Sequence, residues 1–321
     1  MTWFGPAALL GECPRWDEQT QRLHWVDIDN GTLYEARSAA TGWETSRHDV
    51  AAPLAGAVLL ERAERERWLV AVGGDLAAWT VADGLADSFV VEPGSPTCRV
   101  RLNEVVTDPI GRLWVGSMAF DWTPGAGSFH RVDFDGVAHR VLDRITIANG
   151  VGWSPDGGTM YTTDTATGRI TAWDYELDTG AVSRPRLFTA AEPGQGSPDG
   201  LAVDTEGNVW SAFAGGFRVV CFDPSGREIE RVRIPAPNPT SCCFAGPLRD
   251  RLVVTTGRKR LPREALEQYP ESGRVWDAGP VGVRGLPQTR ARVRLAPTPS
   301  EPSRPEPSQS EPYQEVSRHA G

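Results

Sequence analysis

Six short strand-like runs recur along the chain at nearly even intervals, and this repeat constrains the fold more than any other feature. The runs begin at residues 23, 68, 113, 160, 209 and 252, which gives spacings of 45, 45, 47, 49 and 43 residues. They read Leu23-His24-Trp25-Val26, Trp68-Leu69-Val70, Leu113-Trp114-Val115, Met160-Tyr161-Thr162, Val209-Trp210-Ser211 and Leu252-Val253-Val254. Three of the turns before them, DPIGR, SPDGG and DTEGN, supply the glycine that a hairpin needs.

A repeat of this length is typical of the four-stranded blades of a β-propeller, which recur at about 40–50 residues. Six such units nearly fill residues 1–289, so we predict an all-β, six-bladed β-propeller. A pair of β-sandwiches is the alternative, because turn signals alone can produce an uneven spacing. Helical patterns are scarce, and the best candidate is a Pro-led, Glu-rich stretch over residues 261–270.

The composition changes after residue 289. Residues 290–321 are rich in Pro, Ser and Glu and contain few apolar side chains, so they cannot bury enough surface to offset their chain entropy. The sequence therefore predicts one propeller domain over residues 1–289 and a disordered tail over residues 290–321.

Charge and composition exclude several classes of partner. The net charge of −9 argues against a nucleic-acid-binding surface, which needs a basic patch. No apolar stretch of about 20 residues is available to cross a membrane, and the N-terminal segment lacks the basic start of a signal peptide. The five cysteines form no C-x-x-C pair, which favours reduced thiols. We therefore expect a cytoplasmic protein without a membrane or nucleic-acid partner.

Polar residues occupy five of the six positions that lie ten or eleven residues before the repeated runs, in the preceding strand of each blade. That strand is expected to lie nearest the propeller axis, so equivalent positions from different blades should meet in the central channel. These positions are Glu12, Ala57, Asn103, Asn149, Asp199 and Ser241.

The polar positions suggest a metal site on the axis. Oxygen donors from Glu12, Asp199 and the amide of Asn149 suit a hard divalent cation. Without a cation, two facing carboxylates would repel each other and one would stay protonated. The alternative is that these residues cap strand ends or line a water-filled channel.

Five motifs, in order, resemble the regucalcin/gluconolactonase family over about residues 8–288. They are GECPRWDEQTQRLHWVDI (residues 11–28), RLNEVVTDPIGRLWVGSM (101–118), ANGVGWSPDGGTMYTTD (148–164), SPDGLAVDTEGNVW (197–210) and PNPTSCCFAG followed by LVVTTGR (237–258). Members of that family are six-bladed propellers with one divalent metal, and many hydrolyse sugar-acid lactones. The resemblance implies that the metal ligands are Glu12, Asn149 and Asp199. It implies that the substrate contacts are Arg101, Asn103 and Asp121.

This chain departs from the family pattern at two places near the expected substrate. Asn103 is followed by Glu104-Val105-Val106, where the family usually has Asp, Gly and Lys. Phe120 precedes Asp121, the acidic residue that the resemblance assigns to substrate. These changes leave the metal ligands intact but leave the identity of the sugar open. The loop over residues 121–128 is expected to distinguish one sugar lactone from another.

The resemblance implies a lactonase that hydrolyses an aldonolactone, a small-molecule substrate. A divalent metal ion (Ca²⁺, Zn²⁺, Mn²⁺ or Mg²⁺) would polarise the lactone carbonyl, and either Asp199 or a metal-bound water would assist the attack. The alternative is a non-catalytic, calcium-binding, regucalcin-like propeller, and a phosphotriester hydrolase is a third possibility. The chain has neither the G-x-S-x-G motif of a serine hydrolase nor the H-x-x-x-H spacing of a zinc protease.

Overall fold

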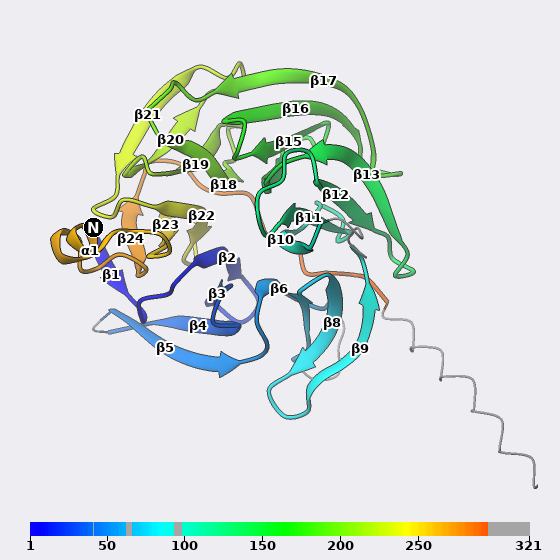
Figure 1. The fold of residues 1–321 in the computed structure, drawn as a ribbon, viewed down its shortest axis with the longest axis horizontal. Helices are drawn as coiled ribbons and strands as arrows, with labels where there is room; N and C mark the ends of the chain where they lie inside the picture. The colour runs from blue at the N-terminus through cyan, green and yellow to red at the C-terminus, as the bar shows by residue number, and fades with distance from the viewer. Residues whose placement is uncertain (41, 62–65, 93–97, 295–321) are drawn as a thin grey trace, which may run out of the picture.

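The protein is a six-bladed β-propeller in a computed structural model that describes residues 1–40, 42–61, 66–92 and 98–294. Six four-stranded antiparallel sheets surround a central axis (Figure 1). Blades 1 to 3 comprise β2 (Gly11–Asp17), β3 (Arg22–Asp27), β4 (Thr32–Ala39) and β5 (Gly42–Asp49); β6 (Leu54–Leu59), β7 (Trp68–Val72), β8 (Asp75–Thr80) and β9 (Gly84–Val90); and β10 (Val100–Thr107), β11 (Leu113–Ala119), β12 (Gly127–Val132) and β13 (Ala138–Ile145). The predicted propeller is confirmed.

The last three blades follow the same pattern. They comprise β14 (Ala148–Trp153), β15 (Thr159–Asp164), β16 (Arg169–Glu176) and β17 (Ala181–Ala190); β18 (Ser197–Val203), β19 (Val209–Ala214), β20 (Arg218–Phe222) and β21 (Glu228–Arg233); and β22 (Pro239–Ala245), β23 (Arg251–Thr256), β24 (Val275–Pro280) and β1 (Thr2–Phe4). Because β1 is the outer strand of blade 6 and pairs with β24, the N-terminal strand closes the ring. The predicted helical stretch contains α1 (Arg263–Gln268), which lies between β23 and β24.

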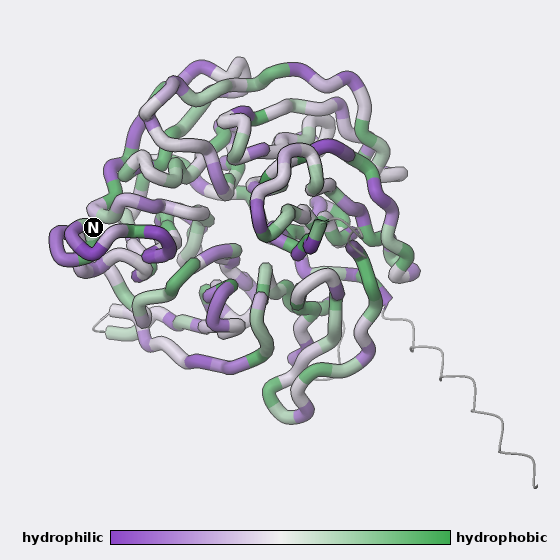
Figure 2. The backbone as a smooth tube through the Cα atoms, in the orientation of Figure 1, coloured by the Kyte–Doolittle hydropathy of each residue, from purple (hydrophilic) through white to green (hydrophobic). Residues whose placement is uncertain are grey.

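The repeated runs of the sequence are the second strands of the blades, and they carry the core. Trp25, Trp68, Trp114 and Trp210 occupy β3, β7, β11 and β19 and are fully buried, so these side chains pack the blades together. The outermost strands are mostly exposed, and polar segments recur along the rim of the ring (Figure 2). Burial therefore increases from the rim toward the axis.

The cysteines are free thiols, as the sequence predicts. Four of them are buried in the blades, and Cys242 and Cys243 contribute to two different hydrophobic clusters. In the described residues, no helix is both long and apolar enough to cross a membrane.

A C-terminal strap, residues 285–294, runs across the far face of the ring, behind the blades in Figure 1. The Ala291 amide donates to the Leu59 carbonyl at 2.8 Å, and Arg290 forms an ion pair with Asp17 at 2.6 Å. Residues 290–294, which the composition assigned to the tail, therefore contact the propeller. The remainder of the predicted tail, residues 295–321, lies outside the described residues.

Candidate metal centre and substrate cavity

A cavity of about 640 Å³ occupies one end of the central channel. Its walls come from the first residues of five inner strands, together with the loops above them. The inner-strand residues that the sequence singled out and that line it are Glu12, Arg101, Asn103, Asn149 and Asp199. The repeat register thus brings together residues that are far apart in the chain. Of the other two register positions, Ala57 is buried in blade 2 and Ser241 lines a second cavity.

Each inner strand has an irregularity in its ladder at the level of the site. In β10 the pairing shifts between Leu102 and Glu104, and in β18 between Pro198 and Leu201. The other four inner strands show the same shift. A β-bulge re-aims side chains and is common beside functional sites. Here it lets neighbouring residues of one strand face opposite ends of the channel, as Asn103 and Glu104 do.

Two glycines directly after the candidate ligands allow the inner strands to approach closely. A Cβ atom on Gly150 would lie 2.4 Å from the Asp199 carbonyl oxygen, and one on Gly200 would lie 2.0 Å from Ser241 Oγ. Only glycine fits such contacts without a shift of the neighbouring strand. The Asn149-Gly150 and Asp199-Gly200 pairs lie within the family motifs of the sequence, but a motif alone does not show that a neighbouring strand approaches so closely.

The two carboxylates of the predicted metal site are buried and form no ion pair with any residue that the structure describes. Burial raises the pKa of Glu12 well above its usual range, and the charges of Asp199 and Glu104 raise it further. Burial and the Glu104 charge likewise raise the pKa of Asp199, although Arg101 opposes this. Without a cation, burial and mutual repulsion therefore favour the protonated form of at least one of the two carboxyls.

The third predicted ligand completes a set of oxygen donors. The Asn149 amide nitrogen donates to Asp199 Oδ1 and to Thr165 Oγ1, the latter at 3.2 Å. To bind a cation, this amide would present its oxygen instead. Among the described residues no group of three or more His, Cys, Asp or Glu side chains is arranged to hold a metal, so an axial site would need a donor of another kind, such as the Asn149 amide. Two buried carboxylates and one amide fit a hard divalent cation, which would offset their repulsion.

Arg101 and Asn103 form a hydrogen-bonded pair beside the carboxylates. Arg101 Nη1 donates to Asn103 Oδ1 at 2.7 Å and to the Leu102 carbonyl at 2.9 Å. Asn103 Nδ2 donates to the Ala148 carbonyl at 3.0 Å, which links blades 3 and 4. The pair is thus fixed in position.

Asp121 is the one predicted site residue that the structure does not bring to the cavity. It is exposed, and its carboxylate accepts hydrogen bonds from the Thr123 amide at 3.0 Å and the Thr123 hydroxyl at 2.7 Å. These bonds lower the pKa of Asp121. Its neighbours Phe120 and Trp122 line the cavity instead. The carboxylate therefore stabilises the β11–β12 loop, and the apolar neighbours face the channel.

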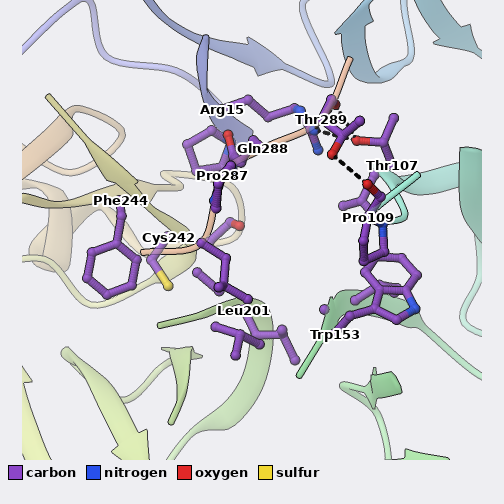
Figure 3. A pocket seen from close by; sticks show the side chains of 18 of the residues that line it. Arg15, Thr107, Pro109, Trp153, Leu201, Cys242, Phe244, Pro287, Gln288 and Thr289 are labelled. Atoms are coloured by element: carbon purple, nitrogen blue, oxygen red, sulfur yellow. Dashed lines mark hydrogen bonds between the residues drawn. The ribbon is translucent and has the colours of Figure 1, made fainter. Parts of the chain in front are cut away.

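A second, smaller cavity of about 260 Å³ lies at the far end of the channel (Figure 3). The strap forms one wall of it, where the Thr289 carbonyl accepts hydrogen bonds from Thr107 Oγ1 at 2.5 Å and Arg15 Nη2 at 3.2 Å. Glu104 lines this cavity, and burial raises its pKa to about 7. The departure from the family pattern at Glu104 thus lies in the far cavity, away from the larger cavity that holds the predicted metal ligands.

At one end of its axis, this six-bladed propeller gathers carboxylates, an amide and a guanidinium. It therefore belongs to the class of propellers with a polar functional site in the central channel. Comparison with known proteins narrows this class. Residues 10–258 match the family described as SMP-30/Gluconolactonase/LRE-like region, and the chain belongs to that family. The resemblance seen in the sequence is confirmed.

Similar proteins cover almost the whole propeller. Pentonolactonase XacC of Haloferax volcanii is 34% identical over 89% of this chain and 96% of its own length. Regucalcin of Gallus gallus is 31% identical over 87% of this chain and 93% of its own length. The crystal structure of a calcium-binding protein, regucalcin, from Agrobacterium tumefaciens superimposes with a TM-score of 0.79. The two sequences are 27% identical, and the match covers 90% of this chain and 95% of the regucalcin chain.

Proposed function

We propose that this protein is a metal-dependent hydrolase of sugar-acid lactones. The observation that carries the proposal is the gathering of Glu12, Asn149 and Asp199 around one cavity with the fixed Arg101–Asn103 pair. The similarity to a pentonolactonase supports the same reaction class.

Glu12, Asn149 and Asp199 would hold the divalent cation, which supplies Lewis-acid polarisation of the lactone carbonyl when bound. Around it, Asn103 would donate a hydrogen bond to the lactone, and Arg101 would hold a hydroxyl or the carboxylate of the product. The Arg101–Asn103 hydrogen bond keeps both groups in place before substrate arrives, which lowers the cost of orientation.

Asp199 is the proposed proton acceptor for the attacking water. Burial raises the pKa of this carboxyl, which makes its anion a stronger base than an exposed aspartate. A bound cation would pull that pKa back down, so the basicity of Asp199 depends on the balance between burial and the cation.

A non-catalytic calcium-binding propeller is the second candidate, and the regucalcins among the relatives favour it. A pure cation-binding protein needs no hydrogen-bonded Arg101–Asn103 pair beside its ligands. Arg101→Ala therefore separates the two functions. If the protein is a lactonase, the variant should bind metal normally and lose lactone turnover. If it is a cation buffer, wild type and variant should bind metal alike and neither should hydrolyse a lactone.

The test is a pH-indicator assay on a panel of five- and six-membered aldonolactones. Chelated protein is assayed alone and after separate addition of Ca²⁺, Mg²⁺, Mn²⁺ or Zn²⁺. We expect metal-dependent acid release above the spontaneous rate, lost in Asp199→Ala. Tight metal binding without hydrolysis of any lactone would favour the calcium-binding alternative.

A further inference from the structure

A contact between two loops crosses the mouth of the substrate cavity. Trp122 lies in the β11–β12 connection of blade 3, and Arg260 lies in the β23–β24 connection of blade 6. The Arg260 guanidinium carbon sits 3.8 Å from the centroid of the Trp122 ring, a close cation–π contact. Blades 3 and 6 face each other across the ring (Figure 1), so this contact, the Arg260–Trp122 clasp, spans the opening.

The loop that presents Arg260 is braced against blade 1. The amides of Arg258 and Lys259 both donate to the Leu9 carbonyl at 2.9 Å, and Lys259 Nζ pairs with Asp29 at 2.9 Å. Arg260 itself has φ 63° and Trp122 has φ 62°, a left-handed conformation that few non-glycine residues adopt. Both side chains are thus held over the cavity in conformations that cost conformational energy, which is a common property of functional loops.

The charge of Arg260 is uncompensated. It makes no ion pair with any residue that the structure describes, unlike its neighbour Lys259. Three carboxylates and three cationic side chains line the cavity, so its formal charge is balanced before a metal binds. They are Glu12, Asp29, Asp199, Arg101, Lys259 and Arg260. A divalent cation would make the cavity positive in a chain whose net charge is −9, and a positive cleft attracts anions.

The size of the cavity leaves room for such an anion. A volume of about 640 Å³ is in the range of sites for drug-sized ligands. A single sugar lactone bound at the carboxylates would leave space in the cavity toward Arg260. We propose that Arg260, held over the mouth by Trp122, selects lactones that carry a carboxylate or phosphate at the end away from the lactone carbonyl. This inference rests on the proposed lactonase function and names its substrate class.

Three related lactones test the proposal: neutral gluconolactone, glucarolactone with a second carboxylate, and 6-phosphogluconolactone. Wild type should prefer one of the two anionic lactones. Arg260→Gln should raise KM for that lactone roughly ten- to hundredfold, which corresponds to the loss of one charge-assisted hydrogen bond. Arg260→Lys should restore part of the loss, and Arg260→Gln should lower kcat/KM for gluconolactone much less than for the anionic lactone.

Arg263→Gln is the matched control, because Arg263 is an exposed arginine of α1 that pairs with Glu267 and does not line the cavity. It should behave as wild type with every lactone. Equal activity of wild type and Arg260→Gln on the anionic lactones would overturn the proposal, as would a wild-type preference for gluconolactone. The comparison of glucarolactone with 6-phosphogluconolactone identifies which anion is recognised.

Calorimetric binding of glucarate, the stable dicarboxylate product, gives a readout that needs no turnover. Arg260→Gln should weaken its binding to the metal-loaded protein roughly tenfold or more, and Arg263→Gln should not. If wild type hydrolyses no lactone, the lactonase proposal fails. If it hydrolyses gluconolactone but glucarate binding is the same in both variants, only the assignment of Arg260 fails. Unchanged thermal midpoints exclude a folding defect.

Discussion

The two ends of the central channel are built from the same inner strands but differ in how they are closed. At the near end, charged side chains line a cavity of about 640 Å³ whose roof includes a single cation–π contact. At the far end, a cavity of about 260 Å³ is partly covered by the strap, which is held by hydrogen bonds and an ion pair. Because many contacts hold the strap, we expect it to stay in place.

This difference arises because the inner strands direct separate groups of side chains to the two ends of the channel. Five of the six inner strands, all except β6, contribute residues to both cavities, and in them Glu12 and Asp199 face the near end whereas Arg15 and Glu104 face the far end.

The largest expected effect belongs to the near end. Asp199→Asn should lower kcat/KM for the best lactone by about 10²- to 10⁴-fold, because it removes the proposed proton acceptor and one proposed anionic metal ligand. Glu104→Gln, a change of the same kind at the far cavity, should lower it far less. Steady-state assays with saturating metal provide the comparison, and equal losses in both variants would remove the functional distinction between the two ends.

Removal of the strap should affect stability more than chemistry. A chain that ends at residue 284 loses the Arg290 partner of Asp17 and the buried side chains of Ala291 and Val293. We expect its free energy of unfolding to fall by about 3–6 kcal/mol. Urea unfolding measures this loss.

A chain that ends at residue 294 is the control for the strap and should be as stable as the full-length protein. Per folded molecule, both truncated chains should retain most of their lactone turnover. A strap deletion without a stability cost would contradict the closure described for the far end.

The pH dependence of stability should identify Glu104. Burial raises the pKa of this carboxyl from 4.5 to about 7, so the folded state holds its proton more tightly than the unfolded state. Its contribution to stability is therefore present below about pH 4.5 and is lost as pH rises to about 7, a change of about 3 kcal/mol at most.

Glu104→Gln removes this titration. In chelated protein, the variant should gain stability relative to wild type between pH 4.5 and pH 8, as measured by urea unfolding at several pH values. A constant difference between the two proteins over this range would show that Glu104 does not titrate as its burial requires.

The smallest effect concerns the close approach of blades 4 and 5. Gly150→Ala places a methyl group against the Asp199 carbonyl and should cost about 1–3 kcal/mol of stability. Gly158→Ala is the control, since its nearest neighbour would be a side-chain oxygen at 3.5 Å. It should be nearly neutral in thermal unfolding, and a similar loss in both variants would contradict the tight contact at Gly150.

The repeat in the sequence predicts most of the axial site, because blade equivalence converts chain position into spatial position. Glu12, Asn103, Asn149 and Asp199 were placed near the axis on that basis, and all four line one cavity. The bulges were not predictable, because a bulge is a relation between two strands and has no fixed signature in one of them.

Two other features depended on long-range contacts. Residues 290–294 look like the start of the Pro-rich tail, and their order comes from distant partners such as Asp17 and Glu61. In the β11–β12 loop, the sequence pointed to Asp121, but turn hydrogen bonds hold that carboxylate outward and Trp122 faces the cavity instead. A loop sequence does not determine which of its side chains faces inward.

An anomalous difference map from crystals grown with Mn²⁺ tests the central claim most directly. The account predicts one strong peak on the axis, coordinated by oxygens of Glu12, Asn149 and Asp199, and no peak in wild-type crystals at the far cavity. Glu12→Gln should weaken or remove that peak. A peak beside Glu104 would contradict the assignment of the site. So would the absence of a peak at the near end, if the protein binds Mn²⁺ tightly in solution.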